Sequence, residues 1–214
     1  MVMPKDGSSE SFRTTVEATS PGITVTLPKV LQEAAVMAAF VIAILGTNLV
    51  LTNYPNVKMF DTLVFVAGYT LGFRRGALIA ATAWIIYGTA NPFGSSGVLL
   101  LGVQIVGEIG YALAGAVARN MLVPEKIQVL PSNTSLMFGI LAVLSTLTYD
   151  VVTNVYTALH WASLAQSTDY SRWIVGTLFN PVALFFAAAH LSSNVLFFAF
   201  FAPLISKAVC KLKG

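Results

Sequence analysis

Long stretches without a charged side chain constrain this chain more than any other feature. No charged residue lies between Glu33 and Lys58, and the run from Ala34 to Thr52 is apolar. About 20 apolar residues are enough to cross roughly 30 Å of hydrocarbon as a helix. A helix also satisfies its backbone polar groups internally, as a bilayer requires. The sequence therefore predicts a helix that spans a membrane.

The composition extends this interpretation to the whole chain. Of the 214 residues, 56% are hydrophobic and 10% are charged, whereas soluble domains carry about 25% charged residues. A net charge of +3 lacks the clustered basic surface of a nucleic-acid-binding protein. The single cysteine, Cys210, excludes a disulfide framework. We expect an all-α integral membrane protein of the cell membrane, in contact with lipid and without a nucleic-acid partner, a metal or another cofactor.

Charges and loop-forming residues divide the chain into six expected membrane helices. Arg74 and Arg75 separate two short apolar runs, and we interpret them as a tight basic turn. One continuous helix would place both arginines near the bilayer centre at about 2.5 to 3.5 kcal/mol each. Asn180 before Pro181 resembles a helix cap with proline in the first turn. The expected helices cover residues 34–52, 61–73, 76–90, 98–118, 132–159 and 181–206, with loops at 91–97, 119–131 and 160–177.

Six crossings place both termini on the same side of the membrane. Ten of the 12 Lys and Arg residues fall on that side, and only Lys58 and Arg172 fall on the other. Basic residues gather in cytoplasmic loops, so we expect both termini in the cytoplasm. The predicted domains are a disordered tail without a secretory signal (1–29), a six-helix membrane domain (30–208) and a short basic tail (209–214).

Small residues repeat at helical spacing near the start of the first helix. Ala34 and Ala38 form one A-x-x-x-A pair, and Ala35 and Ala39 form another. Such faces let helices approach closely in lipid. They serve either packing within the bundle or docking of another membrane subunit. Small residues at the same spacing recur at Gly68, Gly72 and Gly76.

The chain resembles the substrate-binding S components of energy-coupling factor (ECF) vitamin transporters. The resemblance rests on size, six helices, the AAVMAAF segment of the first helix and LGFRRGALIAA around the basic turn. It covers roughly residues 30–208 and leaves the substrate unidentified. It implies capture of a vitamin-like micronutrient at the outer face, and partnership with a membrane T component and two cytoplasmic ATPases. No nucleotide-binding motif G-x-x-x-x-G-K-[ST] occurs in the chain, which agrees with ATPases on other subunits.

Three helices each carry two polar residues one turn apart, an unusual feature within membrane spans. Spacing of i, i+4 puts both members of a pair on one side of the helix. Ionisable groups in a span usually face a cavity or a partner, so we expect a substrate site, the alternative being interhelical hydrogen bonds. The pairs are Gln104 with Glu108, Asp150 with Asn154, and His190 with Asn194.

Aromatic and loop residues complete the predicted site. Trp84 and Tyr87 could stack on a flat ring of the substrate. The resemblance implies that the loops after the first and third helices close over the ligand. The gating residues expected there are Asn53, Tyr54, Asn56, Lys58 and Phe93.

Two other functions compete with capture. An ion- or proton-coupled carrier would use Glu108 or Asp150 as its ion site, although no inverted repeat with matching broken helices is evident. An intramembrane enzyme would use these carboxylates with His190, but the chain lacks H-E-x-x-H and G-x-S-x-G. We therefore expect a protein that is not an enzyme.

Overall fold

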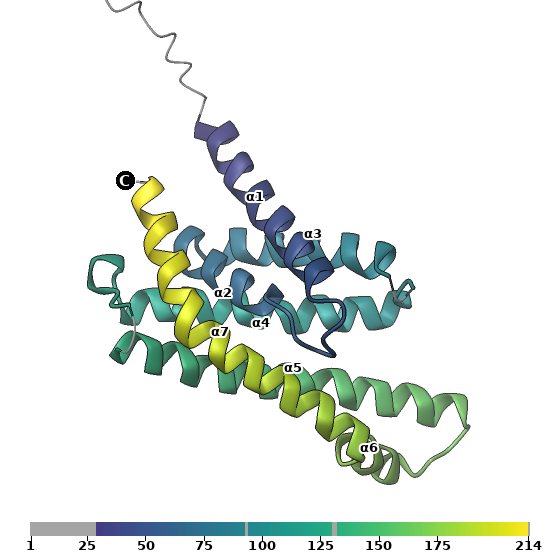
Figure 1. The fold of residues 1–214 in the computed structure, drawn as a ribbon. Helices are drawn as coiled ribbons and strands as arrows, with labels where there is room; N and C mark the ends of the chain where they lie inside the picture. Colours follow the sequence, from purple (N-terminus) through teal and green to yellow (C-terminus); the bar gives the residue numbers. More distant parts are fainter. Residues whose placement is uncertain (1–28, 93, 130–131, 214) are drawn as a thin grey trace, which may run out of the picture.

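The computed structural model describes residues 29–92, 94–129 and 132–213, and the ordered elements within them are all helices (Figure 1). Four of these helices, α1, α4, α5 and α7, are long and apolar enough to cross a membrane, so the chain is an all-helical membrane protein. The predicted disordered tail lies outside the described residues except for Lys29, which begins α1. The elements are α1 (Lys29–Val50), α2 (Phe60–Leu71), α3 (Phe73–Ala90), α4 (Val98–Met121), the 3-10 turn η1 (Pro124–Lys126), α5 (Asn133–Leu164), α6 (Tyr170–Leu178) and α7 (Pro181–Lys213).

The helices α2 and α3 form an antiparallel hairpin, which confirms two short helices joined by a tight turn, although the turn lies at Gly72 and not at the predicted Arg74 and Arg75. The break is a single residue, Gly72, whose φ of 89° is a conformation that glycine adopts readily. Phe60 at the start of α2 stacks on Trp84 near the end of α3, with ring centroids 5.1 Å apart. The two arginines therefore lie in the first turn of α3, immediately after the turn residue.

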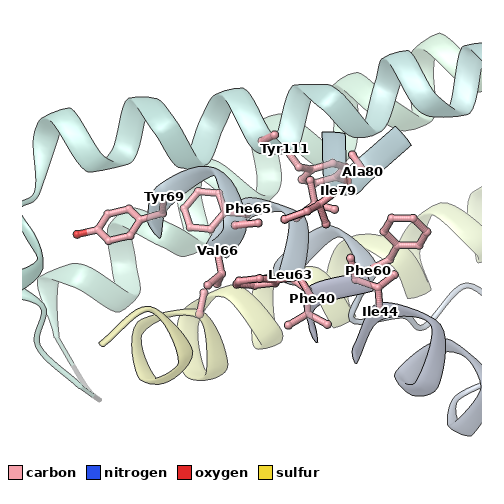
Figure 2. Packing of buried hydrophobic residues seen from close by; sticks show 14 of the residues in the cluster. Phe40, Ile44, Phe60, Leu63, Phe65, Val66, Tyr69, Ile79, Ala80 and Tyr111 are labelled. Atoms are coloured by element: carbon pink, nitrogen blue, oxygen red, sulfur yellow. The ribbon is translucent and has the colours of Figure 1, made fainter. Parts of the chain in front are cut away.

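The short helix α2 forms the core of the bundle. All 12 of its residues are buried, and α1, α3, α4 and α7 pack around it. Figure 2 shows side chains of α1, such as Phe40 and Ile44, and of α3, such as Ile79, gathered around this helix. At 1.5 Å per residue, α2 is about 18 Å long, which is shorter than the roughly 30 Å hydrocarbon layer.

Glycines allow α2 and α4 to cross in backbone contact. A Cβ atom at Gly68 would overlap the carbonyl of Ala112, and one at Gly115 would overlap the carbonyl of Phe65. A Cβ atom at Gly76 of α3 would also come too close to its neighbour, at 2.8 Å from the backbone nitrogen of Gly68. Gly68 and Gly76 of the small-residue pattern therefore pack within the bundle, whereas Gly72 is exposed at the turn.

The alanines of α1 behave differently from these glycines. Ala34, Ala35, Ala38 and Ala39 are all exposed on the surface of the described chain. Among the described residues, these alanines are therefore not packed against other helices of the bundle. Their exposure leaves lipid or another subunit as the neighbour of this face.

The predicted loop over residues 160–177 is wrong. The helix α5 continues to Leu164, and α6 occupies residues 170–178. Asp169 begins α6 because its side chain accepts a hydrogen bond from the Arg172 amide at 3.1 Å. The predicted cap at Asn180 is confirmed, since Asn180 Oδ1 accepts from the amides of Val182 and Ala183 at 2.8 and 3.0 Å. The final helix continues to Lys213, beyond the predicted end at Ser206 and through the predicted basic tail.

Basic residues gather at one end of the bundle. This end holds the start of α1, the α2–α3 turn, the α4–α5 connection and the end of α7 (Figure 1). Two contacts join its parts: Arg75 to Glu33 at 2.6 Å, and Arg119 to the Cys210 sulfur at 3.7 Å. Of the ten Lys and Arg residues in the described ranges, eight lie here, and Lys58 and Arg172 lie toward the opposite end.

Candidate functional site

A cavity of about 820 Å³ lies at the end of the bundle away from the basic residues. Its wall comes from the loop after α1, the ends of α1 and α3, the start of α4, the middle of α5 and the α6–α7 junction. Asn56 fastens the loop to α7, since its side-chain amide donates to the Phe186 carbonyl at 3.0 Å. The polar and aromatic residues in the wall are Asn48, Thr52, Tyr54, Asn56, Lys58, Trp84, Tyr87, Gln104, Tyr149, Asp150, Thr153, Asn154, Thr157, Thr177, Asn180 and Phe186.

Lys58 brings a positive charge into the cavity from the loop that precedes α2. Its ammonium lies 3.5 Å from Asp61 Oδ1 and over the rings of Trp84 and Tyr149, at 5.4 and 4.8 Å from their centroids. Burial by itself would lower the pKa of Lys58. The nearby acids, Asp61 foremost, outweigh burial and hold this pKa above its ordinary value. The side chain therefore carries its charge into the cavity wall.

Asp61 joins the loop to the helices beneath the cavity. Its side chain is fully buried, and its Oδ2 lies 2.6 Å from His190 Nε2 and accepts from Asn194 Nδ2 at 2.7 Å. Because Oδ1 faces Lys58, the carboxylate connects the start of α2 with one face of α7. A buried carboxylate needs such partners, since an isolated buried charge is very costly.

His190 bridges two carboxylates that come from different helices. Its Nε2 contacts Asp61, and its Nδ1 lies 2.7 Å from Asp150 Oδ1 on α5. Hydrogen bonds at both nitrogens require an N–H on each unless one carboxyl carries the proton. The chain Asp61–His190–Asp150 thus links the buried core with the cavity wall through short contacts that can share protons.

Asn194 connects the Asp61–His190–Asp150 contacts to α4 and α5. Its Nδ2 lies 2.9 Å from Thr146 Oγ1 and 3.3 Å from the Tyr111 hydroxyl. The Tyr111 hydroxyl in turn donates to Thr146 Oγ1 at 3.1 Å. All three side chains are buried. The network fixes the rotamers of these three side chains, so the layer beneath the cavity is preorganised.

Glu108 lies beside the histidine bridge, close enough to Asp61 to interact with its carboxylate. It is fully buried on α4, and its Oε2 accepts from the Trp84 indole N–H at 3.1 Å. The prediction that Glu108 and Asp150 lie in one polar region is consistent with this placement, since both act on Lys58 electrostatically. Glu108 orients Trp84 from behind and is not part of the cavity wall.

Several buried polar atoms have no hydrogen-bond partner among the described residues. Both side-chain atoms of Asn48 belong to this group, and so do Gln104 Oε1 and Asp150 Oδ2. Each of these three residues lines the cavity. Buried polar groups in native proteins are almost always satisfied, so the wall offers unused hydrogen-bonding capacity to an occupant.

The predicted site residues divide into two layers. Eight of them lie in the cavity wall: Gln104, Asp150, Asn154, Trp84, Tyr87, Tyr54, Asn56 and Lys58. Three lie buried beneath or behind it: Glu108, His190 and Asn194. Asn53 is not in the wall, and Phe93 lies outside the described residues.

Sequence reasoning placed Asp61 at the start of the second expected helix but did not include this central acceptor among the site residues. It also missed Asn48 and Tyr149 as wall residues. The spacing of Lys58 and Asp61, three residues apart with opposite charge in a nearly uncharged region, was a usable signal for the pair. Nothing in the sequence indicated the contact of Asp61 with His190, which lies 129 residues away.

The described part of the chain contains no group of three or more His, Cys, Asp and Glu side chains arranged to hold a metal ion. The nitrogens of His190 already face carboxylates. No family model matches the chain, and no curated protein or solved structure matches it significantly. The cavity geometry therefore carries the functional argument.

Proposed function

We propose that this protein is the substrate-capture subunit of an ATP-driven importer of the ECF type, which binds a small micronutrient at the outer face. The cavity is the observation that carries this proposal. Its volume of about 820 Å³ falls in the range of small-molecule sites, which is about 300 to 1,000 Å³. Aromatic side chains together with a few buried polar groups are the usual lining of such a site.

The charge distribution supports an outward-facing cavity. The basic end of the bundle would lie in the cytoplasm, because Lys and Arg concentrate in cytoplasmic loops. The cavity is at the opposite end, and it would then open to the outside. In this orientation the six segments α1, α2, α3, α4, α5 and α7 make the crossings, with α2 covering only part of the membrane thickness.

The exposed alanine face of α1 supports a membrane partner. Ala34, Ala35, Ala38 and Ala39 would let a helix of the T component approach closely. The T component would connect the subunit to two cytoplasmic ATPases, since the chain lacks a P-loop motif of its own.

Reconstitution tests this proposal. The protein is combined with a T component and two ATPases in proteoliposomes, and uptake is measured for the molecule that the purified subunit releases on denaturation. We expect uptake only with ATP and only in the complete complex. Ala38→Trp should keep ligand binding but lose complex formation, whereas Leu196→Trp on the exposed face of α7 should keep both. If Ala38→Trp still forms the complex with the T component and still supports uptake, the docking role of α1 is refuted.

A proton-coupled carrier is the second candidate, and one observation favours it. The contacts Asp61–His190–Asp150 form a short path of titratable groups between the core and the cavity, and such chains serve as proton relays in transporters. Uptake by the subunit alone, driven by a proton gradient without ATPases, would support the carrier and contradict capture.

A further inference from the structure

The polar groups of the cavity wall identify the chemical class of its ligand. The inference rests on the proposed function, because it concerns the occupant of the same cavity. Two charged side chains belong to the described wall, Lys58 and Asp150, and they carry opposite charges. Each has hydrogen-bonding capacity that the described residues leave unused.

Lys58 presents an ammonium that the described residues satisfy only in part. Its polar partner among them is Asp61 Oδ1 at 3.5 Å, which is longer than the 2.7 to 3.2 Å of a good N–H···O hydrogen bond. The remaining contacts of the ammonium are with the rings of Trp84 and Tyr149. An anionic or strongly accepting group of a ligand would complete its hydrogen bonds.

Asp150 presents the complementary group. Its Oδ1 faces His190, while its Oδ2 is buried and without a partner among the described residues. The histidine fixes the carboxylate, so Oδ2 is held in place for a donor that comes from the cavity. A cationic or N–H group of a ligand would fill this position with a charge-assisted hydrogen bond.

Asn48 adds a neutral side chain that can both donate and accept hydrogen bonds. Its side chain is only 4% exposed, and neither its amide nitrogen nor its amide oxygen has a partner among the described residues. One wall residue therefore offers a donor and an acceptor together. Gln104 adds a further unpartnered acceptor through its Oε1.

The aromatic residues of the wall favour a ring in the ligand. Trp84 and Tyr87 are arranged edge to face, with centroids 6.0 Å apart and planes at 75°. Such a corner contacts one flat ring through the face of one residue and the edge of the other. Tyr149 contributes a third ring to the same cavity.

We propose that the cavity binds a small ring-containing zwitterion, whose anionic group pairs with Lys58 and whose cationic group pairs with Asp150. A ligand with both charges leaves the wall electrically balanced. A ligand with a single charge would add a net charge to a confined site whose two wall residues have opposite charges, which is unfavourable. The two wall charges thus select against molecules that match only one of them.

Three probes with one ring system test this selection by isothermal titration calorimetry of the detergent-solubilised protein. Tryptophan carries both charges, tryptamine carries only the cation, and indole-3-propionate carries only the anion. Each lost charge-assisted contact removes roughly ten- to a hundredfold in affinity. We expect tryptophan to bind more tightly than either single-charge probe by about this factor.

Two variants assign each preference to a residue. Lys58→Met should abolish the preference for tryptophan over tryptamine, and Asp150→Asn should abolish the preference over indole-3-propionate. Lys126→Met and Glu125→Gln remove the same charges from exposed residues of η1 outside this cavity and should change neither. The probe series on the unaltered protein keeps the test valid if a variant fails to fold.

Equal binding of tryptophan and a single-charge probe would overturn the inference, and so would the absence of binding by all three. A singly charged molecule released from the purified protein would also overturn it, while leaving the capture function intact. If the purified protein releases no small molecule and forms no complex with a T component, the proposed function itself is refuted.

Discussion

Neutralising Asp61 is the perturbation with the largest expected effect on folding. Asp61 is the acceptor at which the loop, α2 and α7 meet, and its side chain is fully buried. The substitution Asp61→Asn keeps the shape of the side chain but removes its charge. The amide then takes away the ion-pair partner of the Lys58 ammonium and weakens the contact with His190.

The expected loss follows from this geometry. Removing one partner of a buried ion pair costs about 3 to 5 kcal/mol, because the other charge remains buried and uncompensated. Lys58→Met should cost less, since Asp61 retains His190 and Asn194 as partners. The double variant removes both charges. It should therefore lose less stability than the sum of the single losses, by about 0.5 to 3 kcal/mol.

Reversible unfolding in mixed micelles measures these free energies. Sodium dodecyl sulfate is titrated into the protein in a mild detergent, and the helical circular dichroism signal reports the folded fraction. Glu125→Gln, an exposed carboxylate in η1, is the matched control and should leave stability unchanged. Additive losses in the double variant would refute the ion pair as a stabilising contact.

Three further changes test the packing and orientation of the bundle. Gly115→Ala should lose about 1 to 3 kcal/mol of unfolding free energy, because the added Cβ overlaps the backbone of α2. Gly110→Ala on the same helix meets open space and should lose nothing, so equal losses of the two variants in the same micelle titration would refute the close crossing. Asn180→Ala should lose about 0.5 to 2 kcal/mol, since two amides at the start of α7 lose their acceptor, and an unchanged titration midpoint would show that the cap is dispensable. A cysteine in place of Arg74 should react with a membrane-impermeant reagent only from the cytoplasmic side; labelling from outside would reverse the proposed orientation.

The helices that could be predicted from the sequence are those with a strong local signal. The two arginines interrupted an apolar run, and the cost of burying them favoured a hairpin, whose turn lies two residues earlier than predicted, at Gly72. Asn180 followed by Pro181 marked the start of α7. The short helix α6 was missed because it follows a polar segment and its nine residues are too few to cross a membrane, so its cap at Asp169 was the clearest local indication.

The candidate site was predictable only in outline. Spacing of i, i+4 identified His190 and Asn194, which lie on the side of α7 that faces Asp61. Their main acceptor could not be found in the same way, because Asp61 begins a separate short helix more than a hundred residues earlier in the chain. Contacts between residues more than a hundred positions apart depend on how the helices pack, and helical periodicity does not encode that.

Occupancy of the cavity is the most direct test of the central claim that this cavity holds a transported molecule. Thr157 lines the cavity on α5, and Ala188 lies exposed on α7 outside it. Mass spectrometry after denaturation measures the small molecule released per protein from the unaltered chain, from Thr157→Trp and from Ala188→Trp. We predict release from the unaltered chain and from Ala188→Trp, and loss of release from a folded Thr157→Trp protein, whose indole fills the cavity. Undiminished release from Thr157→Trp would show that the ligand binds elsewhere and would contradict the claim.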